Sequence, residues 1–350
     1  MQVHLLSGFL GSGKTTAIQQ ACRSLLSSGV SVGVITNDQG IKLVDGYFFK
    51  KLGIPERQVG NGCFCCNYND LDEKMNELVE EHHPQVIFAE SVGTCTDIVA
   101  TVMKPLSRYN KIGHVTLTTV ADARLLEMVI NNSSTFDQDV QYIFFKQLEE
   151  AGLIVVNKTD LVDEASLSKI KEYLLRNYPG SNVILQCSIV EDGVAEWLGV
   201  ISQPAKPELK SLELNYETYA SGEAKMGYLD QQLMFRSSTG NAMHDVLAVI
   251  RVFLEKVGSA GVPVGHLKFW LNDTHKLSFT ATTSSEFPPG NEIENASVCA
   301  LIVNARLQAE PGQMYAMMSD AIKTTPAHVE VINSSFFKPG YPKPVHRIEN

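Results

Sequence analysis

The nine residues GFLGSGKTT, at positions 8–16, constrain the fold of this chain more than any other stretch. They follow the apolar run VHLLSG, which reads as a buried strand, and they lead into KTTAIQQACRSLLSSG, which reads as a helix. Gly8, four further residues, and then Gly13-Lys14-Thr15 make a complete Walker A motif, and strand-loop-helix is the context that the motif requires. We therefore predict a phosphate-binding loop and not a chance glycine-rich turn.

The chemistry of such a loop assigns a role to each of its residue types. Glycines let the backbone N–H groups curl around phosphates, and the helix that follows directs the positive end of its dipole at them. Lys14 can reach the β- and γ-phosphates, and Thr15 can ligate Mg²⁺. The nucleotide contacts predicted from this loop are Gly8, Gly11, Ser12, Gly13, Lys14, Thr15 and Thr16.

Short apolar runs alternate with helical patterns over the first two hundred residues. The predicted strands after the first are VSVGVITN, QVIFAE, HVTLTTVAD, GLIVVNKTD and NVILQCS. This alternation predicts an α/β domain of the P-loop NTPase type over residues 1–201, with a mostly parallel sheet covered on both faces. In such sheets ligands bind at the carboxyl ends of the strands, where the polar motifs of this chain fall.

The remainder of the chain has a different pattern. SQPAKPELK, at 202–210, is polar and carries two prolines, so we interpret it as a linker. Residues 211–335 then read as a smaller α+β domain: a strand AKMGYLDQQLMFRS, a helix NAMHDVLAVIRVFLEKVG, a hairpin around residues 272–274, a further strand and a further helix. Residues 336–350 read as an irregular tail.

The strand VIFAE ends in Glu90, and Gly93 follows three residues later. A carboxylate at this position can hold Mg²⁺, directly or through water, or can orient the attacking water. Gly93 would let a backbone N–H approach the γ-phosphate closely. We predict that Lys14 and Glu90 carry catalysis, and that Thr15 and Glu90 hold Mg²⁺.

The tetrapeptide NKTD, Asn157 to Asp160, follows the strand GLIVV. An aspartate carboxylate can accept both N–H donors on the Watson–Crick edge of guanine, whereas adenine offers the wrong pattern. Lys158 can lay its stem along the base. Following a P-loop and two further strands, the motif predicts that Asn157, Lys158 and Asp160 bind guanine, so that the nucleotide is GTP.

Cys63, Cys65 and Cys66 place three thiols within four positions. Thiolates are soft ligands, suited to Zn²⁺ and other late transition metals, and the flanking glycines leave the loop able to fold around an ion. Three thiolates are one short of a closed tetrahedral shell, which favours a transient site over a permanent structural one. Metal binding is the preferred interpretation, with a redox pair or buried structural cysteines as alternatives.

Charge and composition restrict the partners and the compartment. The formal net charge of −10 disfavours general binding to a nucleic-acid backbone. There is no run of eighteen apolar residues and no signal-like N-terminus, so we expect a cytoplasmic protein without a membrane span. Seven cysteines, an odd number, do not suggest a disulfide framework in a cytosolic chain.

GFLGSGKTT, GNGCFCC, ESVG and NKTD, in this order, resemble the CobW-like family of P-loop GTPases, relatives of the nickel-insertion GTPases UreG and HypB. The segment ITNDQGIKLVD stands where that family has a switch segment, and the resemblance implies that Asp45 contacts Mg²⁺ or the metal region. Ile41 replaces an acidic residue common in the family, and the family's histidine-rich stretch is absent. The resemblance implies a GTPase that carries a metal to a client metalloprotein or a cofactor-assembly protein, such as one of a cobalamin pathway.

Two other classes of protein remain open. One is a regulatory GTP switch whose cysteines hold a structural zinc and whose second domain docks a protein partner. The other is a P-loop kinase or ATPase with a redox-active thiol pair. A homodimer is an assembly that the sequence allows but does not require.

Overall fold

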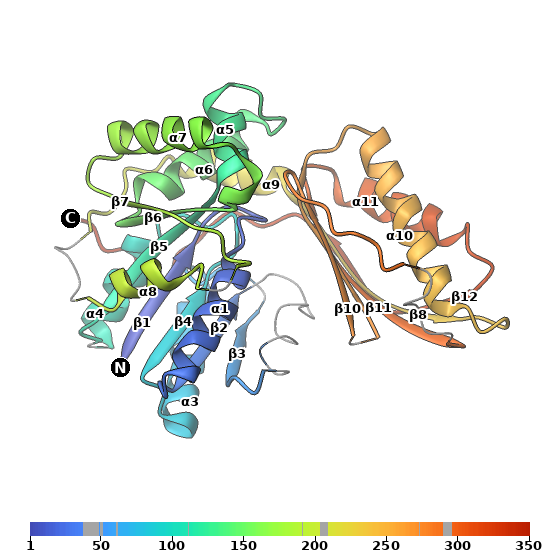
Figure 1. Ribbon diagram of the computed structural model, residues 1–350, viewed down its shortest axis with the longest axis horizontal. Coiled ribbons are helices and arrows are strands. Elements are labelled where there is room, and N and C mark those ends of the chain that lie inside the picture. Colours follow the sequence, from blue (N-terminus) through green and yellow to red (C-terminus); the bar gives the residue numbers. More distant parts are fainter. Residues whose placement is uncertain are drawn as a thin grey trace. The chain divides into compact units, whose positions relative to one another are not determined.

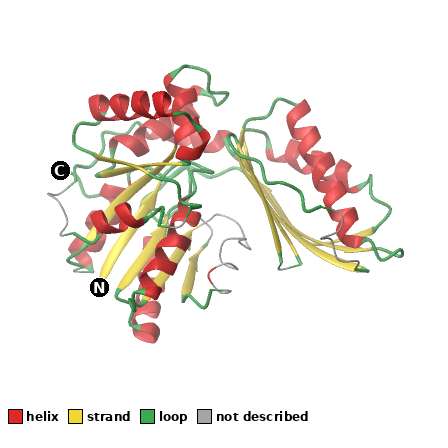
Figure 2. Ribbon diagram, viewed as in Figure 1, coloured by secondary structure: helices red, strands yellow, loops and turns green. Residues whose placement is uncertain are grey.

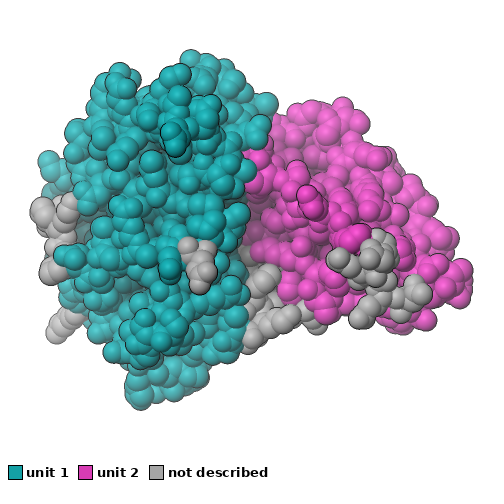
Figure 3. Space-filling view, viewed as in Figure 1, with its two compact units in different colours: residues 1–39, 45–222, 341–350 teal, residues 40–44, 223–340 magenta. Residues whose placement is uncertain are grey.

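The computed structural model describes residues 1–37, 49, 52–60, 62–110, 112–190, 192–203, 209–272, 274–289 and 296–350. Apart from the positions outside these ranges, the chain forms two compact units (Figure 3). The first unit runs from Met1 to Gly222 and also includes Tyr341–Asn350, so the chain returns to it after completing the second unit, Glu223–Gly340.

The first unit is built on a seven-stranded sheet in the order β3-β2-β4-β1-β5-β6-β7, and its strand pairs are parallel (Figure 1). This confirms the predicted parallel α/β domain. The strands are β1 Gln2–Ser7, β2 Val32–Asn37, β3 Glu56–Val59, β4 Val86–Glu90, β5 Val115–Asp122, β6 Leu153–Asn157 and β7 Asn182–Leu185. The helices and helical turns are α1 Lys14–Ser27, α3 Tyr68–His82, η1 Val99–Met103, α4 Lys104–Tyr109, α5 Ala123–Ile130, α6 Gln138–Glu149, η2 Thr159–Leu161, α7 Glu164–Asn177, α8 Ala195–Ile201 and α9 Tyr216–Lys225.

Alternating side chains of the central strand β1 build a hydrophobic core on each face of this sheet. Val3 and Leu5 pack in one core with α3, η1 and α4, whereas Leu6 packs in the other with α1 and α8. A strand with both faces buried has a continuous run of apolar residues. For this reason VHLLS and the neighbouring strands could be predicted from the sequence.

The carboxyl ends of three neighbouring strands bring the predicted motifs together. Asn37 ends β2, Glu90 ends β4 and Ser7 ends β1, and these strands lie side by side in the order β2-β4-β1. On the other side of β1, Asp122 at the end of β5 is paired in register with Asn157 at the end of β6. One edge of the sheet therefore carries the phosphate loop, the NKTD motif and the loops around Glu90 and the cysteines.

The second unit is an antiparallel five-stranded sheet in the order β10-β9-β11-β8-β12, and α10 and α11 cover one of its faces (Figure 2). This confirms the smaller α+β fold. Among the described residues, no helix combines the length and apolar character needed to cross a membrane. The elements are β8 Gly227–Arg236, α10 Ala242–Ser259, β9 Val264–Leu271, β10 His275–Thr280, β11 Val298–Leu307, α11 Pro311–Ile322 and β12 His328–Phe337.

Three elements were not predicted from the sequence. Helix α9 ends at Lys225, so the strand read as beginning at residue 224 begins only at Gly227. β3 is a four-residue polar strand, and β12 is an edge strand with mostly exposed side chains, so neither shows an apolar pattern. Phe336 and Phe337, predicted to lie in the irregular tail, belong to β12.

Candidate functional site

The phosphate loop joins β1 to α1 and depends on its glycines. Gly8, Gly11 and Gly13 have φ angles of 130°, 75° and 95°, in the region that side chains rarely adopt. A Cβ atom on Gly8 would collide with the carbonyl group of Val120, and one on Gly13 would collide with the side chain of Asn157. The backbone of β5 and the NKTD motif therefore enclose the loop closely, and only glycine fits at these two positions.

Lys14 and Thr15 begin helix α1 with their side chains turned into the loop. The Lys14 ammonium, 6% exposed, donates hydrogen bonds to the carbonyl groups of Gly8 (2.6 Å) and Phe9 (3.3 Å). Thr15 Oγ1 donates to Glu90 Oε1 at 2.9 Å. The predicted pair of oxygen ligands for Mg²⁺ is thus brought together, beside a lysine held within the curve of the loop. Thr16, the second predicted threonine, is the third residue of the same helix.

The NKTD motif contacts the phosphate loop through its first residue. Asn157 Nδ2 donates to the Ser12 carbonyl at 2.9 Å, and Asn157 Oδ1 accepts from the Ser188 N–H (3.1 Å) and hydroxyl (2.8 Å). Asp160 is exposed, and its Oδ1 accepts a hydrogen bond from the Cys187 thiol at 3.1 Å. Asn157 thereby tethers the phosphate loop, while the Asp160 carboxylate stays accessible to a base.

Lys158 occupies a constrained position in the same motif. Its φ is 60°, and its Nζ forms an ion pair with Asp122 Oδ2 at 2.7 Å. The other oxygen of Asp122 caps helix α5 by accepting from the N–H groups of Arg124 and Leu125. Asp122, which was not among the predicted site residues, thus holds the ammonium group of Lys158.

The three cysteines lie in the loop between β3 and α3, which Asn37 at the end of β2 holds in place. Asn37 Nδ2 donates to the carbonyl groups of Val59 (2.9 Å) and Gly62 (2.7 Å), and Asn37 Oδ1 accepts from the Phe64 N–H at 2.9 Å. One amide side chain therefore fixes both ends of the turn that presents the thiols.

The sulfur atoms of Cys63, Cys65 and Cys66 all lie within 4.8 Å of one another. Zn–S bonds of about 2.3 Å at a tetrahedral centre separate the sulfurs by about 3.8 Å. The Cys65–Cys66 sulfur distance is 3.8 Å, and the Cys63–Cys65 distance of 2.7 Å would have to open by about 1 Å. This donor set fits a soft divalent ion.

Hydrogen bonding among the thiols distributes their protons unequally. Hydrogen bonds from Cys65, Cys66 and Cys95 to the Cys63 sulfur hold the pKa of Cys63 well below its usual value, because they stabilise its thiolate. The same hydrogen bond from Cys65 to Cys63, with burial, raises the pKa of Cys65. Cys63 is therefore the thiol of the cluster that loses its proton most readily, and metal binding can begin there.

Residues 341–350, here called the returning segment, pack beside the thiols. The Lys343 N–H donates to Cys66 Sγ at 3.3 Å, and the Val345 N–H donates to the Cys65 carbonyl at 2.9 Å. Arg347 Nε forms an ion pair with Asp97 at 2.8 Å. A segment without helix or strand is thus fixed to the first unit by specific polar contacts.

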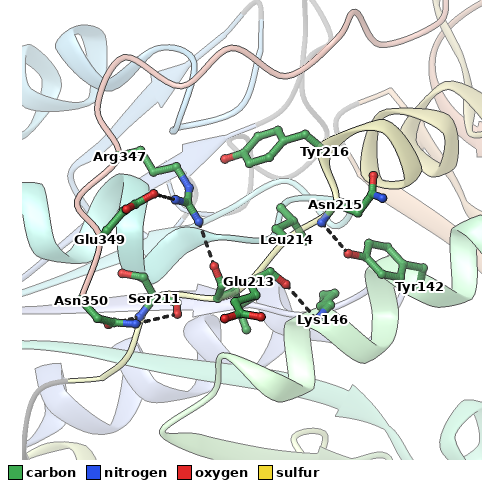
Figure 4. Close-up of a pocket in the computed structure, with 11 residues that line it drawn as sticks. Tyr142, Lys146, Ser211, Glu213, Leu214, Asn215, Tyr216, Arg347, Glu349 and Asn350 are labelled. Carbon is green, nitrogen blue, oxygen red and sulfur yellow. Dashed lines mark hydrogen bonds and ion pairs between the residues drawn. The ribbon is translucent and has the colours of Figure 1, made fainter.

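The returning segment also borders a groove of about 820 Å³ in the first unit (Figure 4). Arg347 Nη2 donates to the Leu212 carbonyl at 2.8 Å, and the Asn350 side chain exchanges hydrogen bonds with the backbone of Ser211. Residues 211–215 and the returning segment therefore hold each other along this groove.

The predicted site residues and the residues found at the site differ in two ways. Asp45 lies outside the described residues. Conversely, Asp122, Ser188, Gln147 and Cys95 contact predicted site residues but were not predicted. Asp122 and Ser188 gave a signal in the sequence, because each lies at or just after the end of a predicted strand at the ligand-binding edge.

The fold and the site together define a P-loop nucleotide-binding protein with a thiol cluster at the same edge of the sheet as its phosphate loop. The family model described as CobW/HypB/UreG, nucleotide-binding domain, matches residues 2–185, and the chain belongs to that family. The resemblance inferred from the four motifs is therefore confirmed.

Characterised relatives extend this comparison. A zinc chaperone CobW of Sinorhizobium sp is 30% identical over 191 residues, covering 48% of this chain and 53% of the relative. The zinc-regulated GTPase metalloprotein activator 1 of Dictyostelium discoideum is 28% identical over 218 residues, covering 53% of this chain and 45% of the relative. The chain thus spans about half the length of the curated relatives it matches.

Among solved structures, HypB from Helicobacter pylori in complex with nickel is similar, with 16% identity and a TM-score of 0.44. The match covers 61% of this chain and 92% of that one. A similarity this loose assigns no property to the chain beyond what its own geometry supports.

Proposed function

We propose that this protein binds and hydrolyses GTP and uses the nucleotide to control a thiolate metal site from which it delivers a metal to a client. The observation that carries the proposal is the meeting of three motifs at adjacent strand ends: Gly8 follows β1, Glu90 ends β4, and Asn37 of β2 holds the cysteine loop. Phosphate and metal would therefore be bound by neighbouring loops of one rigid sheet.

We assign roles in GTP hydrolysis to the side chains of Lys14, Thr15 and Glu90. Lys14 exchanges its hydrogen bonds to the Gly8 and Phe9 carbonyl groups for the β- and γ-phosphate oxygens. Thr15, with Glu90 directly or through water, would hold Mg²⁺, and the ion would supply positive charge to those oxygens. The oxygen of an attacking water bonds to the γ-phosphorus while the bond from that phosphorus to the bridging oxygen breaks. The proton that the water loses passes to a phosphate oxygen and then to solvent, giving GDP and inorganic phosphate.

Guanine selection rests on Asp160, whose exposed carboxylate can accept both Watson–Crick N–H donors of guanine. Asp122 supports it by holding Lys158 where its stem can cover the base. We therefore expect the protein to bind GTP much more tightly than ATP. Equal affinities for the two nucleotides would instead favour the alternative of a P-loop kinase or ATPase.

The metal is proposed to be Zn²⁺ or another soft divalent ion, bound by Cys63, Cys65 and Cys66. Thiolate chemistry supports this, and so do the names of two relatives, a zinc chaperone and a zinc-regulated GTPase metalloprotein activator. The client is proposed to be a metalloprotein or a cofactor-assembly protein.

The deciding experiment titrates Zn²⁺ into the reduced, full-length chain in the apo, GDP-bound and GTP-analogue-bound states. A metal carrier should show affinities that differ between nucleotide states by about 5- to 150-fold, corresponding to a coupling of about 1–3 kcal/mol. A variant with Ser at positions 63, 65 and 66 should lose the site, whereas Cys299→Ser, in the core of the second unit, should keep it. Zinc binding that survives the triple replacement would reject the site.

One observation favours a second candidate, a GTP switch with structural zinc. Cys63 and Cys65 are only 4% and 3% exposed, and the returning segment packs beside them. A permanently bound ion would show equal affinity in every nucleotide state, and its removal would lower the melting temperature. The same titration therefore separates the two candidates.

A further inference from the structure

A fourth thiol lies against the cysteine cluster, on a different loop. Cys95 follows Glu90 by five residues, is 2% exposed, and belongs to the same buried core as Cys63 and Cys65. Its thiol interacts with those of Cys63 and Cys65, but it lies outside the set of three sulfurs, those of Cys63, Cys65 and Cys66, that are all within 4.8 Å of one another. The adjacency of β2 and β4 brings together thiols that are far apart in the sequence.

The backbone around Cys95 is held firmly in this position. Its N–H donates to the Val92 carbonyl at 2.9 Å. Gln147 of α6, 1% exposed, donates from Nε2 to the carbonyl groups of Cys95 (2.8 Å) and Gly93 (3.0 Å). Thr96, the next residue, donates to the buried carboxyl of Glu150 at 3.1 Å. The loop is therefore anchored on both sides of the sulfur, as a metal ligand requires.

We propose that a small shift of its turn makes Cys95 the fourth metal ligand, closing a four-sulfur shell with Cys63, Cys65 and Cys66. This inference rests on the proposed metal-binding function. Each thiol gives up its proton to solvent as its sulfur bonds to the ion, so that four thiolates and one divalent cation leave a net charge of −2. No oxidant or other reactant is needed.

The fourth ligand would also connect the metal to the nucleotide. Gly93 lies against the phosphate loop: a Cβ atom there would collide with the side chain and backbone nitrogen of Leu10. Gly93 and Cys95 share one turn, and one Gln147 side chain binds both of their carbonyl groups. Contacts with a γ-phosphate that displaced this turn as a unit would carry Cys95 with Gly93, so the shell would change between four sulfurs and three.

The first test requires no mutation. X-ray absorption at the zinc edge, on the reduced full-length chain with one equivalent of Zn²⁺, counts the sulfur ligands. The proposal predicts four sulfurs at about 2.3 Å in at least one nucleotide state. Three sulfurs completed by oxygen or nitrogen in the apo, GDP and GTP-analogue states would overturn it, while the proposed metal site itself would stand.

The second test compares Cys95→Ala with Cys22→Ala, a buried thiol of α1 in the opposite core. Titration with Co²⁺ reports thiolate ligands through their charge-transfer absorbance. Cys95→Ala should lose a quarter of that absorbance, bind Zn²⁺ at least about tenfold more weakly and lose the dependence on nucleotide, whereas Cys22→Ala should match the parent protein. Unchanged absorbance and affinity in Cys95→Ala would overturn the inference.

Folding of the variant is checked by its GTP affinity and circular dichroism, and if it does not fold, the sulfur count of the parent protein decides alone. Failure of the parent protein to bind Zn²⁺ or Co²⁺ at all would instead reject the proposed function together with the inference.

Discussion

Replacing Arg347 with Ala should release the returning segment and expose the thiols beneath it. Arg347 forms an ion pair with Asp97, whose side chain is 1% exposed against 27% for that of Arg347. Breaking a fully buried pair costs about 3–5 kcal/mol, and partial exposure with the remaining Tyr216 hydrogen bond to Asp97 reduces this to about 2–3 kcal/mol. The population of the detached segment should therefore rise roughly 30- to 150-fold.

The assay is thiol labelling of the reduced, metal-free protein, quantified peptide by peptide. Cys65, whose carbonyl group is bound by the Val345 N–H, should be labelled faster by about that factor. Cys187, in a separate part of the first unit, is the internal reference, and Arg347→Lys is the matched control that keeps the charge. An unchanged ratio of Cys65 to Cys187 labelling would refute the reasoning, as would an equal rise at buried Cys22, since that would indicate global unfolding.

Three further predictions concern nucleotide binding and pH. Lys14→Ala should abolish tight GTP binding and turnover in a folded protein, because it removes the cation that reaches the phosphates; near-normal turnover would contradict the P-loop assignment. Asp160→Asn should weaken GTP by roughly ten- to hundredfold without affecting ATP, since one guanine N–H then faces a donor; an equal fall for both nucleotides in calorimetry argues against base reading. Burial raises the pKa of Glu150 to about 8, so the folded state holds its proton where the unfolded state does not. As the pH rises from about 4.5 to 8, the free energy of unfolding should thus fall by up to about 1.4 kcal/mol per pH unit. Urea titrations at several pH values should show a weaker pH dependence for Glu150→Gln.

The parts of the molecule that the sequence predicted are those with a short-range signal. The strand before Gly8 and the helix after Lys14 follow from apolar runs and periodicity, and the phosphate loop follows from a motif whose glycine conformations the structure shows to be required. No local sequence pattern determines the order of the strands in the sheet. Without the strand order, the proximity of Thr15 to Glu90 could be inferred only from the motifs.

The positions of Cys95 and the returning segment could not be predicted from local sequence patterns. Cys95 is separated from Cys66 by a complete helix and strand, and only the pairing of β2 with β4 brings its thiol to the cluster. The returning segment has no periodicity, because it is held by individual contacts such as Val345 to Cys65 and Arg347 to Asp97. Contacts of this kind depend on the completed tertiary structure and leave no pattern in the sequence.

The path of the returning segment has a consequence for biosynthesis. Cys63, Cys65 and Cys66 leave the ribosome early, whereas Tyr341–Asn350 is translated only after the entire second unit. At about 5–20 residues per second, the roughly 270 intervening residues take about 15–55 s to make. During that interval the nascent first unit holds its thiols without the segment that later packs beside them, so we expect these thiols to react with metal ions or oxidants faster than the same thiols of the finished protein.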